Sequence, residues 1–421
     1  MLQANAGSGL QRVPAHGRGF PVMLAALVSC FALSQAYRTV PGVTAGAIAA
    51  EFSLSQQQVT QFAAAFHLAF AVMQIGVGIS LDRYGAKRTA CWLFSLTVLG
   101  ALLSALAPTY AVLVLGQALI GFGCAPALLA CLVFIGRHVG ANRLSAVSGL
   151  VMSVGGIGTL MTATPLAWLV ELWSWRAGFL VLAALSALAV LACGLLVERD
   201  PERGADATES LGASFRMLFA VITMRQAPAI LILGGITYAV VMAIRSLWLV
   251  PLFTERYDFS LVSAGNVVLI MSVAMMLGPA LFGRLDPGPR LRRRVIFACT
   301  LLLAALIAAL GLCPAASPVA AIAIAVTMAL QGGFTILQYA DTRTAYPPQS
   351  QGRALSALTM SMFAGVAIVQ WLSGLAAALA SNHGADPVTA AYLSLAAIAV
   401  AGAAAFALLP GPRRQEHAPA P

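Results

Sequence analysis

Runs of about 20 hydrophobic residues recur from Phe20 to Leu409, separated by short segments that hold Pro, Gly and charged residues. As a helix, each run is long enough to cross about 30 Å of hydrocarbon. The first run has no small-residue cleavage site and many others follow it, so we predict a transmembrane helix there and not a signal peptide. Twelve spans are predicted, at 21–47, 59–80, 89–108, 110–135, 144–170, 175–197, 227–253, 262–284, 293–313, 318–340, 354–380 and 388–410.

The composition agrees with a membrane protein. Of the 421 residues, 60% are hydrophobic and only 9% are charged, and the mean hydropathy is +0.89. One water-soluble core cannot bury that much apolar surface, so lipid is expected to cover much of it. We therefore predict an all-α polytopic fold in the lipid bilayer, and we expect a monomer.

The positive charges fall in alternate loops. If the N-terminus is cytoplasmic, the outer loops hold only Arg176 and Arg256. This asymmetry predicts a multi-pass protein of the cytoplasmic membrane with both termini inside, and it explains the net charge of +10 without nucleic acid as a partner. The inner loops then hold Arg83, Lys87, Arg88, Arg137, Arg143, Arg199, Arg203, Arg216, Arg225, Arg284, Arg290, Arg292, Arg293, Arg294, Arg343, Arg353, Arg413 and Arg414.

One long polar segment follows the sixth span, and we interpret it as a cytoplasmic linker. The predicted organisation is an N-terminal six-helix bundle at 1–197, a linker at 198–226 and a C-terminal six-helix bundle at 227–421.

Short motifs recur between these halves at nearly one spacing. Phe52 and Phe259 are 207 residues apart, as are Arg38 and Arg245, and Asp82 and Asp286 are 204 apart. Several matches in the same order indicate pseudo-symmetric, duplicated halves.

The loop after the second span, GISLDRYGAKR at 78–88, resembles the loop between helices two and three of the major facilitator superfamily (G-x-x-x-D-R-x-G-x-K/R-R). Further similarity in 36–40, 71–78 and 346–354 is closest to the sugar-phosphate-permease branch, near the organophosphate:phosphate antiporters. The resemblance implies the fold of that superfamily and transport by alternating access.

A gate is expected at the same loop. Gly85 permits a tight turn, and Asp82 lies at a helix end where it can pair with Arg83 or a neighbouring helix N-terminus. The resemblance implies that Asp82, Arg83 and Arg88 latch the two halves on the cytoplasmic side. The alternative is a solvated loop whose charges only fix topology.

Arg38 and Arg245 are the two full charges far from the ends of the spans, and no Asp or Glu lies in a span interior to pair with them. A charge near the bilayer centre costs about 2.5 to 3.5 kcal/mol on insertion scales, so both are expected to face a wet cavity. A guanidinium fork suits carboxylate or phosphate. We hypothesise that the pair holds an anion; the alternative is that both side chains snorkel to the outer headgroups.

Other polar residues lie at helical spacing from these arginines or in neighbouring spans. His67 is the only histidine inside a span and could carry a proton, although a structural role is as compatible with the sequence. We expect Asp341 and Arg343 to pair at the inner end of the tenth span. Further candidates for the cavity are Gln35, Gln74, Tyr238, Trp248 and Gln338, with Gln370 and Trp371 as additional residues that could face it.

We predict a secondary transporter of a small organic anion, a carboxylate or an organophosphate. A drug or neutral-metabolite efflux transporter is the first alternative, and a transporter-like membrane sensor is the second. No catalytic constellation, P-loop or metal-ligand spacing is found, and the seven cysteines read as apolar packing residues. An enzyme, a cofactor and a metal site are therefore not expected.

Overall fold

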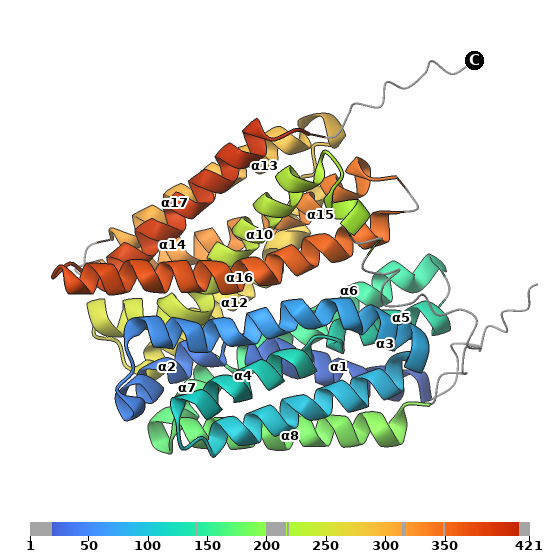
Figure 1. Cartoon of the computed structure of the whole chain (residues 1–421), viewed down its shortest axis with the longest axis horizontal. Helices are drawn as coiled ribbons and strands as arrows, with labels where there is room; N and C mark the ends of the chain where they lie inside the picture. Colours follow the sequence, from blue (N-terminus) through green and yellow to red (C-terminus); the bar gives the residue numbers. More distant parts are fainter. Residues whose placement is uncertain are drawn as a thin grey trace, which may run out of the picture.

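The computed structural model describes residues 19–139, 141–198, 216, 219–313, 317–347 and 350–411. All regular secondary structure in these ranges is helical (Figure 1). Eleven helical segments among them are long and apolar enough to cross a membrane. The remaining predicted span, 59–80, forms the first part of a 50-residue helix that bends at Gly85. The predicted all-α polytopic fold is confirmed.

The first half of the chain contains eight helices that follow the first six predicted spans. They are α1 (Gly19–Tyr37), α2 (Val40–Phe52), α3 (Gln56–Ala105), α4 (Tyr110–Cys124), α5 (Ala127–His138), α6 (Ala141–Met161), α7 (Thr164–Leu172) and α8 (Trp175–Leu196).

The second half follows the last six predicted spans. Its described elements are α10 (Ala227–Ala243), η2 (Ile244–Trp248), α11 (Leu249–Pro251), η3 (Leu252–Arg256), α12 (Leu261–Arg284), α13 (Pro289–Gly311), α14 (Pro318–Gln331), η4 (Gly332–Phe334), α15 (Thr335–Ala345), α16 (Gln351–Asn382) and α17 (Pro387–Leu408).

The first span is broken in the middle, and proline explains the position of the break. Pro41 near the start of α2 has no backbone N–H, and its ring would clash with the carbonyl of Tyr37, so α1 ends there and Arg38 lies between two helices. The hydroxyl of Thr162 donates to the freed carbonyl of Ala36 at 3.1 Å. Broken helices persist in a membrane when protein groups satisfy the freed backbone in this way.

The seventh span is wound differently. Its segments η2 and η3 are π-helical and surround the single α-helical turn α11. A π-helical turn holds more residues than an α-helical one, so side chains beyond it are rotated from the face that α-helical spacing predicts.

Two hydrophobic cores account for the packing. One consists mainly of residues from α1–α8 and the other of residues from α10–α17. The largest sets of contacts between the halves join α3 to α16 and α7 to α12. We propose that the boundary between two bundles falls in the predicted 198–226 linker, most of which lies outside the described residues.

The backbone repeats between the halves at its turns. Gly85 has φ 75° and ψ 176°, and Gly288 has φ 79° and ψ 171°. Ser53 and Asp258 are left-handed, each two residues before the serine N-cap of the next helix, Ser55 or Ser260. These caps are 205 residues apart, so the spacing of 207 that pairs Phe52 with Phe259 is wrong by two. It follows that Arg38 and Arg245 are 15 and 13 residues from equivalent turns.

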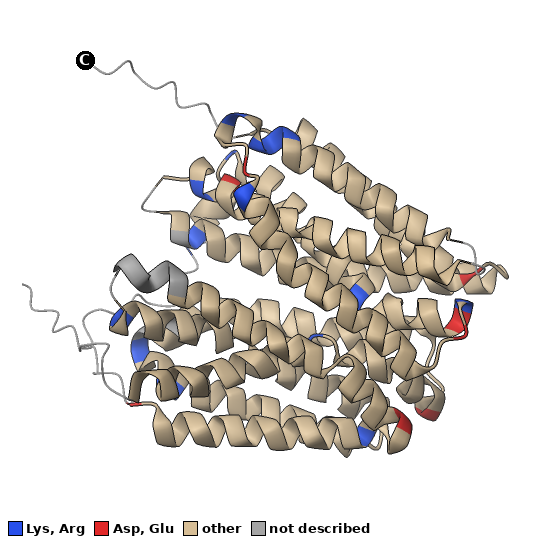
Figure 2. Ribbon diagram, turned by 180° about the vertical axis from the view of Figure 1, so that it is seen from behind, with Lys and Arg blue, Asp and Glu red and all other residues tan. Residues whose placement is uncertain are grey.

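The start of α1 and the end of α17 lie toward the same end of the molecule, on the right in Figure 1. In Figure 2, seen from behind, segments with Lys and Arg gather at this end, and segments with Asp and Glu predominate at the opposite end. We call these the inner and the outer end.

At the outer end, small residues bring the two halves into contact. A Cβ added at Gly42 of α2 would lie 2.8 Å from the Ser246 carbonyl oxygen of η2. One added at Gly374 of α16 would overlap the Thr60 side chain of α3, and one at Gly265 of α12 would lie 3.1 Å from the methyl of Ala167. We call these three contacts the outer seal. Backbones approach this closely only where side chains are small.

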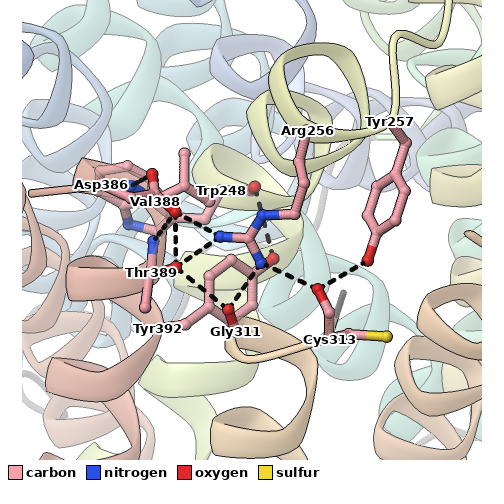
Figure 3. Close-up of polar contacts among 9 residues, drawn as sticks. All are labelled: Trp248, Arg256, Tyr257, Gly311, Cys313, Asp386, Val388, Thr389 and Tyr392. Carbon is pink, nitrogen blue, oxygen red and sulfur yellow. Dashed lines mark hydrogen bonds and ion pairs between the residues drawn. The ribbon is translucent and has the colours of Figure 1, made fainter. Parts of the chain in front are cut away.

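An arginine also joins three helix ends within each half. Arg256 donates to Asp386 and Thr389 at the start of α17, both at 2.5 Å, and to the Gly311 carbonyl at the end of α13 at 2.6 Å (Figure 3). In the first half the charges are exchanged. Glu51, equivalent to Arg256 in the 205-residue register, accepts from Arg176 at the start of α8.

Replacing Arg256 with Ala should lower the stability of the C-terminal half by about 2 kcal/mol or more, because hydrogen bonds to charged groups are lost. Burial by itself would raise the pKa of Asp386, but hydrogen bonds from Thr389, Arg256 and two backbone amides outweigh it and lower that pKa. A depressed carboxyl pKa contributes stability that is present above the unfolded value of about 3.9 and is lost only as the pH falls through the folded value.

The deficit should therefore be constant between about pH 5 and 8. Thermal unfolding in detergent measures it, with Arg343→Ala as the control because Arg343 is exposed at the inner end of α15. Equal deficits in the two variants would contradict a special role for Arg256.

Candidate functional site

The aromatic ring of Phe363, on α16, is the centre of a group of side chains in the middle of the protein. Its centroid lies 4.1 Å from that of Phe70, 6.3 Å from that of His67 and 5.6 Å from that of Tyr238. The guanidinium carbon of Arg38 lies 4.8 Å from the same centroid. These residues come from both halves of the chain, so a molecule bound among them would contact both.

Arg38 lies at the break between α1 and α2 and is 8% exposed. Its guanidinium contacts the faces of Phe70 and Phe363, at 5.2 and 4.8 Å, which is cation–π geometry. Its Nε is buried without a hydrogen-bond partner, and none of the ion pairs found among the described residues includes it. This cation is therefore poorly compensated within the described protein.

Arg245 differs from Arg38 because it already has a partner. It is 3% exposed, and its Nε and Nη2 donate to the hydroxyl of Ser272 at 3.1 and 3.0 Å. Ser272 follows its N-cap serine by 12 residues, as His67 follows Ser55, so Ser272 is the counterpart of His67 in the 205-residue register. The burial of both arginines away from the helix ends disfavours snorkelling.

Gln370 lies on α16 and completes this group. Its Nε2 donates to the Ser246 hydroxyl at 2.9 Å, and its Oε1 is buried without a partner. His67 beside it is 1% exposed, and its Nε2 is likewise unpartnered. Trp371, the next residue, is 42% exposed at the protein surface.

Three more predicted residues lie near this group. Gln35 is half-buried one turn before Arg38, and its Oε1 is buried and unpartnered. Gln74 donates to the Ala125 carbonyl at 3.4 Å, at the break between α4 and α5. Tyr238 is half-buried against Phe363.

Two predicted residues lie elsewhere. Trp248 is fully buried in the second core, where its Nε1 donates to Ser373 at 2.9 Å, because the π-helical η2 rotates it from the expected face. The amide of Gln338 is buried and pairs with Thr237 at 2.8 Å. Both placements fit helix packing better than contact with a substrate.

The predicted gate is described only in part. Gly85 has the positive φ that its turn requires, and Arg83 lies over the Tyr84 ring at 5.3 Å. The side chain of Asp82 lies outside the described residues, so the latch formed with Arg83 and Arg88 stays a prediction.

The equivalent loop of the second half shows what such an aspartate can do. Asp286 accepts from Nε and Nη2 of Arg292 at 3.0 and 2.7 Å, and the Arg292 guanidinium lowers the pKa of this carboxyl. The expected pair of Asp341 with Arg343 is wrong, because Asp341 accepts from Arg293 of α13 at 3.3 Å.

The sequence interpretation missed Phe70, Phe363, Ser246 and Ser272. Phenylalanine and serine are common in apolar spans, so nothing in their local sequence separates residues at a site from residues in a core. The only available signal was position, since Phe363 and Gln370 are two helical turns apart on one face of α16.

Residues 25–291 match the sequence profile of the Major Facilitator Superfamily, which is more than half of the chain. The chain belongs to this superfamily. It is therefore a membrane transporter of the major facilitator type, as the loop at 78–88 had indicated. Over 177 residues it is 27% identical to the "Multidrug resistance protein B homolog" of Mycobacterium tuberculosis, which covers 41% of the chain but only 32% of that relative's length.

Solved structures of transporters share the fold. A D-xylose-proton symporter matches this superfamily member with a TM-score of 0.72 and 13% identity, over 94% of this chain and 99% of the symporter. A bacterial homologue of the human lysosomal transporter Spinster, in an inward-facing and occupied conformation, matches with a TM-score of 0.70 and 19% identity, over 93% of this chain and 97% of that one. At these identities the likeness concerns the fold alone.

Proposed function

We propose that this transporter moves a small organic anion, a carboxylate or an organophosphate, across the cytoplasmic membrane by alternating access. The observation that carries the proposal is the state of Arg38, a buried guanidinium in the middle of the protein with an unpartnered nitrogen and no carboxylate beside it. An anion would supply the missing acceptor, and Arg245 would add a second positive charge near it.

The neighbouring groups support a small organic ligand. Phe70, Phe363 and Tyr238 provide apolar and aromatic surface, while Gln35 and Gln370 provide free acceptors. Mostly apolar walls with a few placed polar groups are typical of small-molecule sites. The similarity of the loop at 78–88 and of 346–354 to the sugar-phosphate-permease branch supports organophosphates within this class.

The proposal includes orientation. Lys and Arg gather at the end of the molecule where α1 begins and α17 ends, which supports cytoplasmic termini and the inner membrane as the location (Figure 2).

Drug efflux is the second candidate, favoured by the 27% identity to a multidrug resistance protein homologue. A cationic drug would be expected to meet a carboxylate in the membrane interior. The described carboxylates lie toward the ends of their helices, and Asp341, the most buried, is paired with Arg293. This distribution favours the anion.

Uptake into proteoliposomes tests the two candidates in one assay. The panel would contain lactate, pyruvate, benzoate, glycerol 3-phosphate, a neutral hexose and a cationic dye, each with and without a pH gradient. We expect saturable uptake of at least one anion and none of the dye. Transport of the dye or the hexose without any anion would overturn the proposal.

A further inference from the structure

A line of hydrogen bonds runs from α10 and η2 to α16, and its donors and acceptors are determined by the groups at its start. The Ser246 hydroxyl donates its single proton to the Met242 carbonyl at 2.6 Å. Its oxygen can then only accept, so Gln370 must present Nε2 to it, at 2.9 Å. The orientation of the Gln370 amide follows, and Oε1 is left as a buried acceptor without a partner.

His67 ends a similar line on α3. Its Nδ1 lies 3.2 Å from the Ala63 carbonyl, which accepts only, so Nδ1 carries the proton of a neutral ring. Nε2 is then an acceptor, and it too is buried without a partner. Gln370 is the polar neighbour of the ring. Two buried acceptors thus lie next to each other with no donor between them, which polar interiors avoid.

We propose that His67 and Gln370 together bind a proton that is transported with the anion, so that the proton is a co-substrate. A proton on Nε2 turns this atom into a donor toward Oε1 of Gln370 and satisfies both atoms at once. The inference rests on the proposed anion site at Arg38 and adds the coupling ion to it.

The charges around His67 couple the two ligands. Arg38 contacts Phe363, whose ring is stacked on that of His67, and Arg245 is the next cation, bound to Ser272. The other elements around His67 bring neutral groups: α16 brings Phe363 and Gln370, and α4 packs Gly121 against the neighbouring Phe66.

A second positive charge on His67 is therefore unfavourable until an anion neutralises Arg38. The anion favours the proton, and by thermodynamic reciprocity the proton favours the anion. The site should bind and release the two together.

Carboxylates are the suitable probes, because lactate, pyruvate and benzoate keep one charge between about pH 5.5 and 8.5. We expect the affinity of the wild-type protein for the best of them to fall by about tenfold per pH unit in the upper part of this range, since one proton binds with each anion. Calorimetry in buffers of different ionisation enthalpy should count about one proton taken up per carboxylate.

His67→Gln supplies a permanent donor that does not titrate, so its affinity should be independent of pH. The matched control is His383→Gln, because His383 is exposed at the end of α16, where its Nδ1 contacts the Leu379 carbonyl. This control should keep the wild-type slope. The proton count in the wild-type protein needs no variant, so the test stands even where His67→Gln does not fold.

The possible results separate the two proposals. A pH-independent wild-type affinity, or a wild-type slope retained in His67→Gln, would overturn the proton site and leave the anion site intact. If no carboxylate binds at any pH and no organophosphate is transported, the proposed function itself fails, and the coupling with it.

Discussion

Replacing Arg38 with Lys should weaken binding of the best transported anion by about 10- to 100-fold while the protein remains folded. Lysine keeps the charge but loses the planar fork and the contacts with the Phe70 and Phe363 rings. Hydrogen bonds to charged groups contribute about 1.5 to 3 kcal/mol, and each 1.4 kcal/mol is a factor of ten in affinity. Ligand-induced thermal stabilisation measures the loss, since a ligand that binds only the folded state raises its stability.

Arg245→Lys is the matched control, because it makes the same exchange at a guanidinium that Ser272 already engages. The cation is retained, so we expect a loss of less than about fivefold. Equal large losses in both variants would favour a joint clamp in place of an anchor at Arg38. Wild-type stabilisation in both would contradict the anion site and bring the neutral-substrate alternative forward.

Replacing Gly42 with Ala should open the outer seal. The added Cβ would lie 2.8 Å from the Ser246 carbonyl oxygen, and a backbone atom cannot move aside as a flexible side chain can. Overpacking of this kind costs about 1 to 3 kcal/mol, which shifts a two-state balance by about tenfold or more. Because the strain exists only while α2 and η2 touch, the conformation with a closed outer end loses population.

Distances between spin labels at Ala50 and His383, both exposed at the outer end, would report this change. The seven native cysteines would be replaced beforehand. Gly46→Ala is the control: Gly46 is one turn further along α2, and a Cβ there would meet nothing within 4 Å. We expect a longer distance in Gly42→Ala only. An unchanged distribution would show that the closed outer end tolerates the extra carbon.

The candidate site could be predicted from the sequence only where a residue type is costly in its surroundings. Arg38, Arg245 and His67 were identified because charged and titratable groups are rare in a span, and this holds whatever they contact. Phe70 and Phe363 carry no such cost, since a phenylalanine in an apolar run can equally face lipid, core or cavity. Trp248 was misplaced because helical spacing assumes 3.6 residues per turn, and η2 departs from it.

The sequence by itself determined that the chain is a polytopic helical membrane protein, where its spans lie and how its halves repeat. These properties depend on the transfer free energy and order of local residues, which require no knowledge of distant contacts. Only the tertiary structure decided that Arg245 has a partner and Arg38 does not, and that Gln370 donates to Ser246, 124 residues away. Hydrogen bonds and ion pairs depend on distances of about 3 Å between groups far apart in the chain, and only the packed helices set those distances.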